Sequence, residues 1–236
     1  VQMKTTSKII ALLCFVNIAF AQNIQFGFRG GANWSKMTEF ELVENIIPQF
    51  RFMPAPSGAL FLELPINKNF SIQPEVTFTQ KGFLLKEGID AGGDFLGVDL
   101  KIGARAALKT NYIEVPVLAK IKMGAEENGV RSYFVFGPAV GYMADAGVVV
   151  RVLQILPIRS DIGTGFFNQF EISGVGGAGI EIPIGNAKMF LEGRYQHGFS
   201  RVLDTPVIAL PVRNRTFGAS LGFSIPIGTS RKIERI

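Results

Sequence analysis

The stretch FSIQPEVTFT, residues 70–79, decides the fold class, because its side chains alternate strictly between apolar and polar. The apolar members are the even-numbered residues from Phe70 to Phe78, and the polar members are the odd-numbered residues from Ser71 to Thr79. Successive side chains of an extended chain point to opposite faces. A period of two therefore predicts a β-strand with one apolar and one polar face.

The same alternation recurs along the chain and predicts an all-β protein of eight strands. We expect these strands at 24–34, 59–64, 70–79, 112–122, 133–143, 170–184, 189–199 and 215–227. No stretch approaches 18 uninterrupted apolar residues, which excludes helical membrane spans. Eight such strands fit two architectures: a soluble, lipocalin-like barrel with its apolar face inward, or an outer-membrane barrel with its apolar face toward lipid.

Composition and connection lengths favour the eight-stranded antiparallel transmembrane β-barrel. The polar faces carry mainly Gly, Ser, Thr and charges of both signs, whereas a sheet that faces water is normally richer in Lys, Glu and Asp. Short connections (65–69, 124–129 and 185–188) alternate with long ones (35–58, 80–110, 144–169 and 200–214). Tight periplasmic turns and long extracellular loops are typical of outer-membrane barrels. Prolines in the first long connection, among them Pro54 and Pro56, predict an irregular loop there.

The ends of the chain predict an exported protein. Lys4 and Lys8 precede an apolar stretch at 9–21 that ends in the small-x-small sequence Ala19-Phe20-Ala21, which is the pattern of a secretory signal peptide. We therefore expect a signal peptide at 1–21, a barrel domain at 22–228 and a charged periplasmic tail at 229–236.

The polar faces predict an ion-pair network inside the barrel. With eight strands the interior is just filled by side chains, and buried charges persist only when they are paired. We expect the cations to pair with several of the glutamates in a structural role. The predicted set is Arg29, Glu63, Glu75, Glu114, Lys120, Glu171, Glu181, Glu192 and Arg194.

Residue counts limit the chemistry that the chain could perform. One Cys and one His exclude sites that need two of either residue, so we expect no metal and no cofactor. A formal charge of +5 without a basic run predicts no nucleic-acid partner. A lipid-modifying enzyme would need His197 as its base, with Ser200 and Asp204 nearby, but His197 shares the lipid-facing parity and is expected at the rim. The apolar segment 148–158 is expected to be an external loop that covers the barrel mouth, lies on the membrane or docks a partner.

Several motifs resemble the PorT-like outer-membrane β-barrel family common in Bacteroidetes. They are FRGGANW at 28–34, QPE at 73–75, YIEVPVLAK at 112–120, Gly137-Pro138, and GAGIE at 177–181. The third is close to the family's Y-[IL]-E-[IV]-P-[LV]-L-x-K strand. The named member assists protein export through the type IX secretion system, and the family has no known catalytic set. The resemblance implies a non-catalytic structural or interaction role as an accessory to secretion or surface assembly, with outer-membrane lipid and envelope or secretion proteins as partners. A narrow porin for small solutes is the alternative.

Overall fold

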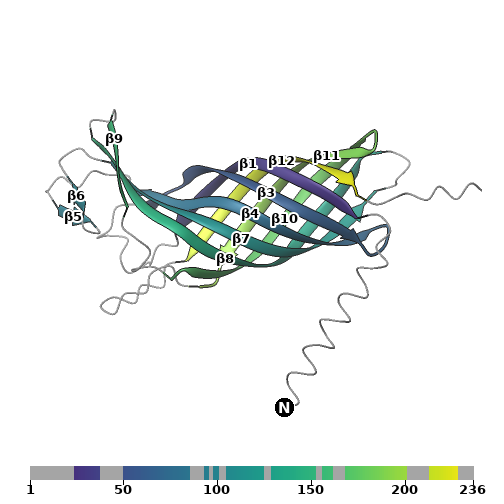
Figure 1. Cartoon of the computed structure of the whole chain (residues 1–236), viewed down its shortest axis with the longest axis horizontal. Helices are drawn as coiled ribbons and strands as arrows, with labels where there is room; N and C mark the ends of the chain where they lie inside the picture. Colours follow the sequence, from purple (N-terminus) through teal and green to yellow (C-terminus); the bar gives the residue numbers. More distant parts are fainter. Residues whose placement is uncertain are drawn as a thin grey trace, which may run out of the picture.

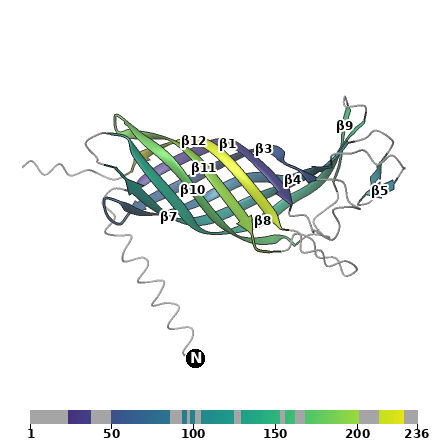
Figure 2. The ribbon, with the colours of Figure 1, turned by 180° about the vertical axis from the view of Figure 1, so that it is seen from behind.

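Eight long strands close into one antiparallel barrel in the computed structural model (Figures 1 and 2). The structure describes residues 24–37, 50–85, 93–95, 98–100, 105–124, 129–152, 156–161, 168–200 and 213–227. Each long strand pairs with the next along the chain, and the last pairs with the first, which confirms the predicted fold class. The barrel strands are β1 (Gln25–Met37), β3 (Met53–Pro65), β4 (Phe70–Leu85), β7 (Arg105–Met123), β8 (Arg131–Val152), β10 (Phe170–Ile184), β11 (Ala187–Gly198) and β12 (Asn214–Pro226).

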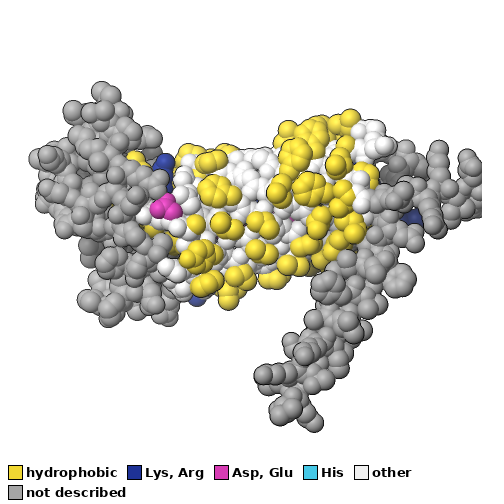
Figure 3. All heavy atoms as spheres, viewed as in Figure 1, with side chains coloured by type: hydrophobic (Ala, Val, Ile, Leu, Met, Phe, Trp, Pro, Cys, Tyr) yellow, Lys and Arg dark blue, Asp and Glu magenta, His cyan; other side chains and the backbone are white. Residues whose placement is uncertain are grey.

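The barrel wall is apolar outside and polar inside. Large hydrophobic side chains on every strand are exposed, and they cover the wall in the space-filling view (Figure 3). The alternate residues, mostly Ser, Thr, Glu and Lys, are buried. A lipocalin-like barrel would have the opposite arrangement, so that alternative is wrong. None of the described residues forms a helix that could span a membrane.

The two ends of the barrel differ, and we call them the turn end and the loop end. At the turn end, β3 and β4, β7 and β8, and β10 and β11 are joined by residues 66–69, 124–130 and 185–186. Gly185 has a φ of 60°, which a tight two-residue turn requires and which glycine adopts without strain. The long connections all lie at the loop end. The predicted signal peptide and the predicted tail fall outside the described residues.

At the loop end the strands continue beyond the barrel, which corrects the prediction of a loop at 148–158. There β8 runs to Val152 and pairs with β9 (Leu156–Asp161), so that Val148 lies opposite Ser160. On its other side, Val148 lies opposite Leu108 of β7. The segment is therefore a strand and a hairpin, because β-branched valines with a partner on each side favour an extended chain. Figure 1 shows β9 projecting from the barrel.

The neighbouring strands also extend, and three short strands complete the loop end. Gly82 pairs with Lys109 and Leu84 with Ala107, so both ends of the predicted long connection 80–110 are strand. Strand β2 (Phe50–Arg51) pairs with β4, and β5 (Gly93–Phe95) pairs with β6 (Val98–Leu100).

The expectation of an irregular loop around Pro54 and Pro56 is wrong. Both prolines lie in β3, opposite Trp34 and Ala32 of β1. Among the described residues, the pairing of β3 with β4 at this end starts only at Ser57, so the preceding part of β3 has one strand partner. Proline is tolerated at such an edge because the absence of its N–H leaves no ladder hydrogen bond unmade.

Candidate functional site in the barrel interior

All nine side chains of the predicted set point into the barrel, and each is largely or fully buried. They come from six of the eight barrel strands, and the strand register brings them together in three groups along the barrel axis. We call these the turn-end cluster, the central cluster and the loop-end cluster. A buried charge is stable only beside a partner of opposite sign, and each group provides one.

The central cluster consists of Arg29, Glu75, Glu192 and Arg194. Arg194 donates two parallel hydrogen bonds to Glu75, with Nη1 2.8 Å from Oε2 and Nη2 2.7 Å from Oε1. Arg29 Nη2 also donates to Glu75 Oε2, at 3.2 Å. Arg194 Nε donates to Glu192. Two guanidinium groups and two carboxylates balance each other, and the bidentate geometry fixes the position of Arg194.

The turn-end cluster consists of Glu63, Lys120, Lys122, Glu181 and Lys188. Lys120 Nζ lies 2.8 Å from Glu63 Oε2 and 2.9 Å from Glu181 Oε2, so it bridges β3 and β10. Lys122 donates to Glu63, and Lys188 Nζ lies 3.6 Å from Glu181 Oε1 at the partly exposed rim.

The loop-end cluster is built around Lys81, a residue that sequence reasoning missed. Its Nζ lies 2.6 Å from Glu114 Oε1 and 2.7 Å from Glu171 Oε1, and its side chain has no exposed surface. Asn214 Nδ2 donates to Glu171 Oε2 at 2.6 Å. Glu114 and Glu171 therefore pair with Lys81 rather than with the three predicted cations. One signal could have found Lys81: the predicted set holds six glutamates but only three cations, and Lys81 continues the inward parity of Glu75.

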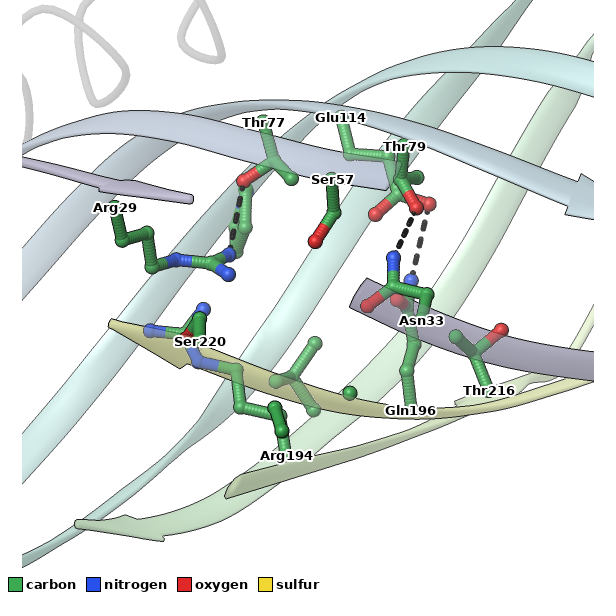
Figure 4. Close-up of a pocket in the computed structure, with 14 residues that line it drawn as sticks. Arg29, Asn33, Ser57, Thr77, Thr79, Glu114, Arg194, Gln196, Thr216 and Ser220 are labelled. Carbon is green, nitrogen blue, oxygen red and sulfur yellow. Dashed lines mark hydrogen bonds between the residues drawn. The ribbon is translucent and has the colours of Figure 1, made fainter. Parts of the chain in front are cut away.

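A small polar chamber separates the central and loop-end clusters (Figure 4). Its volume is about 30 Å³, and its lining includes Arg29, Arg194, Gln196 and Thr216. Gln196 Nε2 donates to Glu114 Oε1 at 3.1 Å across it. Among the described residues, Arg29 Nε and Thr216 Oγ1 are buried without a hydrogen-bond partner. A chamber of this size holds about two water molecules, and water bound there would satisfy such atoms.

An apolar layer separates the central cluster from the turn-end cluster. Phe61 and Phe190 meet edge to face with ring centroids 5.6 Å apart, and Tyr133 completes the layer with Leu118 and Val135. Phe61 is the cross-strand neighbour of Glu75 in the central cluster. On the other side, Lys120 Nζ lies 4.2 Å from the centroid of the Tyr133 ring, a cation–π contact.

Glycines on the neighbouring strands, each the direct cross-strand partner of one ring, make room for these rings. A Cβ on Gly27 would lie 2.1 Å from the Phe61 ring, and one on Gly222 would lie 2.3 Å from the Phe190 ring. A Cβ on Gly179 would lie 2.5 Å from Tyr133. The rings therefore fill space that any larger residue at these positions would occupy, and the interior is packed across its width.

The structure gives His197 different partners from those that catalysis would need. His197 Nδ1 lies 3.3 Å from the Tyr195 hydroxyl on the outer wall. Ser200 Oγ accepts a hydrogen bond from the backbone N–H of Ile172 at 2.9 Å. Asp204, the third residue considered, lies outside the described residues. In the described part of the chain, no group of three His, Cys, Asp or Glu side chains is arranged to hold a metal ion.

Comparisons with known proteins place the chain among outer-membrane barrels. A family model described as an outer membrane protein beta-barrel domain matches residues 20–204. No curated protein matches the sequence significantly.

Solved barrel structures are similar at low sequence identity. Ail, the attachment invasion locus protein of Yersinia pestis, is 14% identical over 86% of this chain and 99% of its own, with a TM-score of 0.41. Neisserial surface protein A is 13% identical over 85% and 96%, with a TM-score of 0.44. The outer membrane protease OmpT from Escherichia coli is 11% identical over 88% and 97%, with a TM-score of 0.33. An attachment protein and a protease both occur among these structures, so they assign no activity to the chain.

Proposed function

The chain belongs to the outer membrane protein beta-barrel domain family, and we propose that it acts there without catalysis, as a structural and interaction protein that assists protein secretion or surface assembly. Its motifs resemble those of PorT-like proteins, which supports an accessory role of this kind. A signal peptide at 1–21 would direct its export. The barrel is then a rigid anchor, and its loop end carries the contacts with envelope or secretion proteins.

The observation that carries this proposal is the closed barrel interior. Three ion-paired clusters and one aromatic layer succeed each other along the axis, and the chamber between the central and loop-end clusters has a volume of only about 30 Å³. We propose that the predicted network fills and rigidifies the barrel. A packed interior argues against the alternative of a narrow porin, since a solute would have to break several buried ion pairs to pass.

The loop end offers a backbone surface for a partner. Strand β9 pairs with β8 along one edge, and in the described residues its other edge has no strand beside it. An edge strand with unpaired N–H and C=O groups can accept an extended segment of another protein as an added strand. The β8–β9 hairpin is thus the segment that we expect a partner to contact.

Conductance measurements test the closed interior. We expect the purified protein to show no steady current in a planar bilayer, because the ion-paired clusters and the Phe61–Phe190 layer together block the path. The double variant Phe61→Ala/Phe190→Ala removes the rings but keeps the ion-paired clusters on both sides, so it should stay closed as well, as should Phe78→Ala, which removes an outward-facing ring. A steady current through the wild-type protein would contradict the proposal and favour the porin.

Affinity purification tests the interaction role. The tagged protein would be isolated from native outer membranes in mild detergent, beside a variant in which an Asn-Gly turn replaces residues 148–160 and joins the paired residues Gly147 and Asp161. We expect proteins in a fixed ratio with the full chain and their loss from the shortened variant. Heat-modifiable migration on a gel would show that the shortened barrel still folds. A monomer without bound proteins in both samples would refute the accessory role.

A further inference from the structure

Four adjacent strands carry an ordered pattern on the lipid-facing wall near the loop end. Strands β10, β11, β12 and β1 lie side by side (Figure 2). Their register aligns outward-facing residues of one chemical kind in three successive rows, the first two on β1, β12 and β11 and the third on all four strands. From the loop end toward the membrane centre, these rows are basic, aromatic and small.

The basic row consists of Lys36, Arg215 and His197. Lys36 is the cross-strand partner of Arg215, which is in turn the partner of His197. None of the three forms an ion pair with an acidic residue in the described part of the chain, and the Nε of Arg215 is buried without a hydrogen-bond acceptor. Lys36 Nζ instead lies 5.2 Å from the centroid of the Phe52 ring. Lys36 and Arg215 are therefore the two cations of this row that can bind an external anion.

The aromatic row lies two residues further along each strand. It consists of Trp34, Phe217 and Tyr195, which are again direct cross-strand partners. The Phe217 and Tyr195 rings stack with centroids 4.8 Å apart. Aromatic girdles of this kind mark the boundary between the hydrocarbon and the headgroups in transmembrane barrels. The basic row above it then lies at the level of the lipid headgroups.

The small row lies below the aromatic row and forms the floor of a groove. Ala32, Ala219, Gly193 and Ala178 are successive cross-strand partners. Around Gly193 and Ala178 the wall is hollowed by a groove of about 450 Å³. Its sides are formed by the rings of Trp34, Phe217, Tyr195 and Phe134. This groove is shallow and mostly apolar, although Arg194 also contributes to its lining, and it lies in the hydrocarbon region, where an acyl chain is the complementary occupant.

From these rows we infer a binding site for a phosphorylated glycolipid of the outer leaflet, with its phosphates on the basic row and one acyl chain in the groove. Three features support this assignment: cations without acidic partners, their position at the headgroup level on the extracellular side, and an apolar groove directly beneath them. Adjacent strands lie about 4.8 Å apart, so the basic row spans roughly 10 Å. That width suits a headgroup with two phosphates better than a single phosphodiester. The site goes beyond the proposed accessory role and does not depend on it.

Lipid binding to the purified full-length protein in detergent tests the site. Native mass spectrometry would measure the affinity for bisphosphorylated lipid A, monophosphorylated lipid A, phosphatidylglycerol and phosphatidylcholine. We expect bisphosphorylated lipid A to bind most tightly, at least tenfold more tightly than phosphatidylglycerol. The variant Lys36→Gln/Arg215→Gln should lose at least tenfold in affinity for bisphosphorylated lipid A and should no longer distinguish it from the monophosphorylated form.

Matched variants separate the site from general effects of charge and size. Lys109→Gln removes an outward cation from β7, away from the basic row, and should leave binding unchanged. Gly193→Leu fills the groove and should weaken lipid A binding several-fold. Gly30→Leu adds the same side chain to open space outside the groove and should not. Unchanged binding by the Lys36/Arg215 variant would overturn the site, and equal binding of phosphatidylglycerol and lipid A would overturn the glycolipid assignment.

Discussion

Replacing Glu75 with Gln should destabilise the barrel strongly, because this one carboxylate holds together the central cluster. It accepts hydrogen bonds from Arg194 at 2.7 and 2.8 Å, from Arg29 at 3.2 Å and from Gln73 at 2.7 Å. Its side chain has no exposed surface. In Glu75→Gln, the new amide NH₂ group faces guanidinium N–H donors instead of accepting from them. The two buried cations, Arg29 and Arg194, then have only Glu192 as a carboxylate partner in the central cluster. Removing one partner of a buried ion pair costs about 3–5 kcal/mol, so we expect a loss of that size in the free energy of unfolding.

Urea unfolding in lipid vesicles would measure this loss. Trp34 is the single tryptophan and faces outward at the membrane boundary, so its fluorescence reports whether the barrel is inserted and folded. The control is Lys188→Gln, which breaks a longer contact of 3.6 Å to Glu181 by a side chain that is 28% exposed. A partly exposed pair contributes about 0–1 kcal/mol. The double variant Glu75→Gln/Arg194→Gln should be less destabilised than the sum of its single variants, because it removes a cation together with its partner.

A Glu75→Gln loss below about 1 kcal/mol, equal to that of Lys188→Gln, would refute the central role of this carboxylate. Additive effects of Glu75→Gln and Arg194→Gln would refute it as well, because two residues joined by a bidentate ion pair must be energetically coupled.

Two further predictions concern glycines. Gly27→Ala should lower the free energy of unfolding by about 1–3 kcal/mol, because its Cβ would lie 2.1 Å from the Phe61 ring. Urea unfolding should show a smaller loss when the same substitution is made in a Phe61→Leu background. An equal loss in both backgrounds would contradict the ring contact. Gly82→Ala should destabilise the loop end by at least about 1–3 kcal/mol, since φ is 147° and the Cβ would lie 1.9 Å from Leu108 O. Hydrogen exchange should then rise at the β4–β7 pairing beyond the barrel, and an unchanged exchange pattern would contradict this explanation.

The distribution of side chains between lipid and interior could be predicted from the sequence alone. A strand has a side-chain period of two, so the face of each residue follows from its parity without knowledge of its partners. Parity placed Phe28 and Phe78 outside and Glu75 inside, and the alternation of short and long connections then distinguished the two ends of the barrel. The physical reason is that lipid and a packed interior select opposite side chains along every strand.

Strand ends were harder to predict, because alternation stops where the surroundings are no longer lipid. Beyond the membrane, residues on both faces of β8 can be apolar, so the alternation is lost. For that reason Val148 was predicted to lie in a loop. Pro54 and Pro56 were predicted to lie in a loop, because a proline in a strand with two partners removes one of the hydrogen bonds between strands. Only the tertiary pairing shows that this part of β3 has one strand partner.

The partners inside the barrel were decided by the tertiary structure. Arg194 and Glu75 are 119 residues apart, and Lys81 and Glu171 are 90 apart. Parity gives the face of each residue but not its height along the axis, which depends on the stagger of all eight strands as the barrel closes. The contact between the Phe61 ring and Gly27 likewise depends on the register between their strands. The sequence by itself thus determined which side chains face inward, and only the closed barrel decided which of them meet.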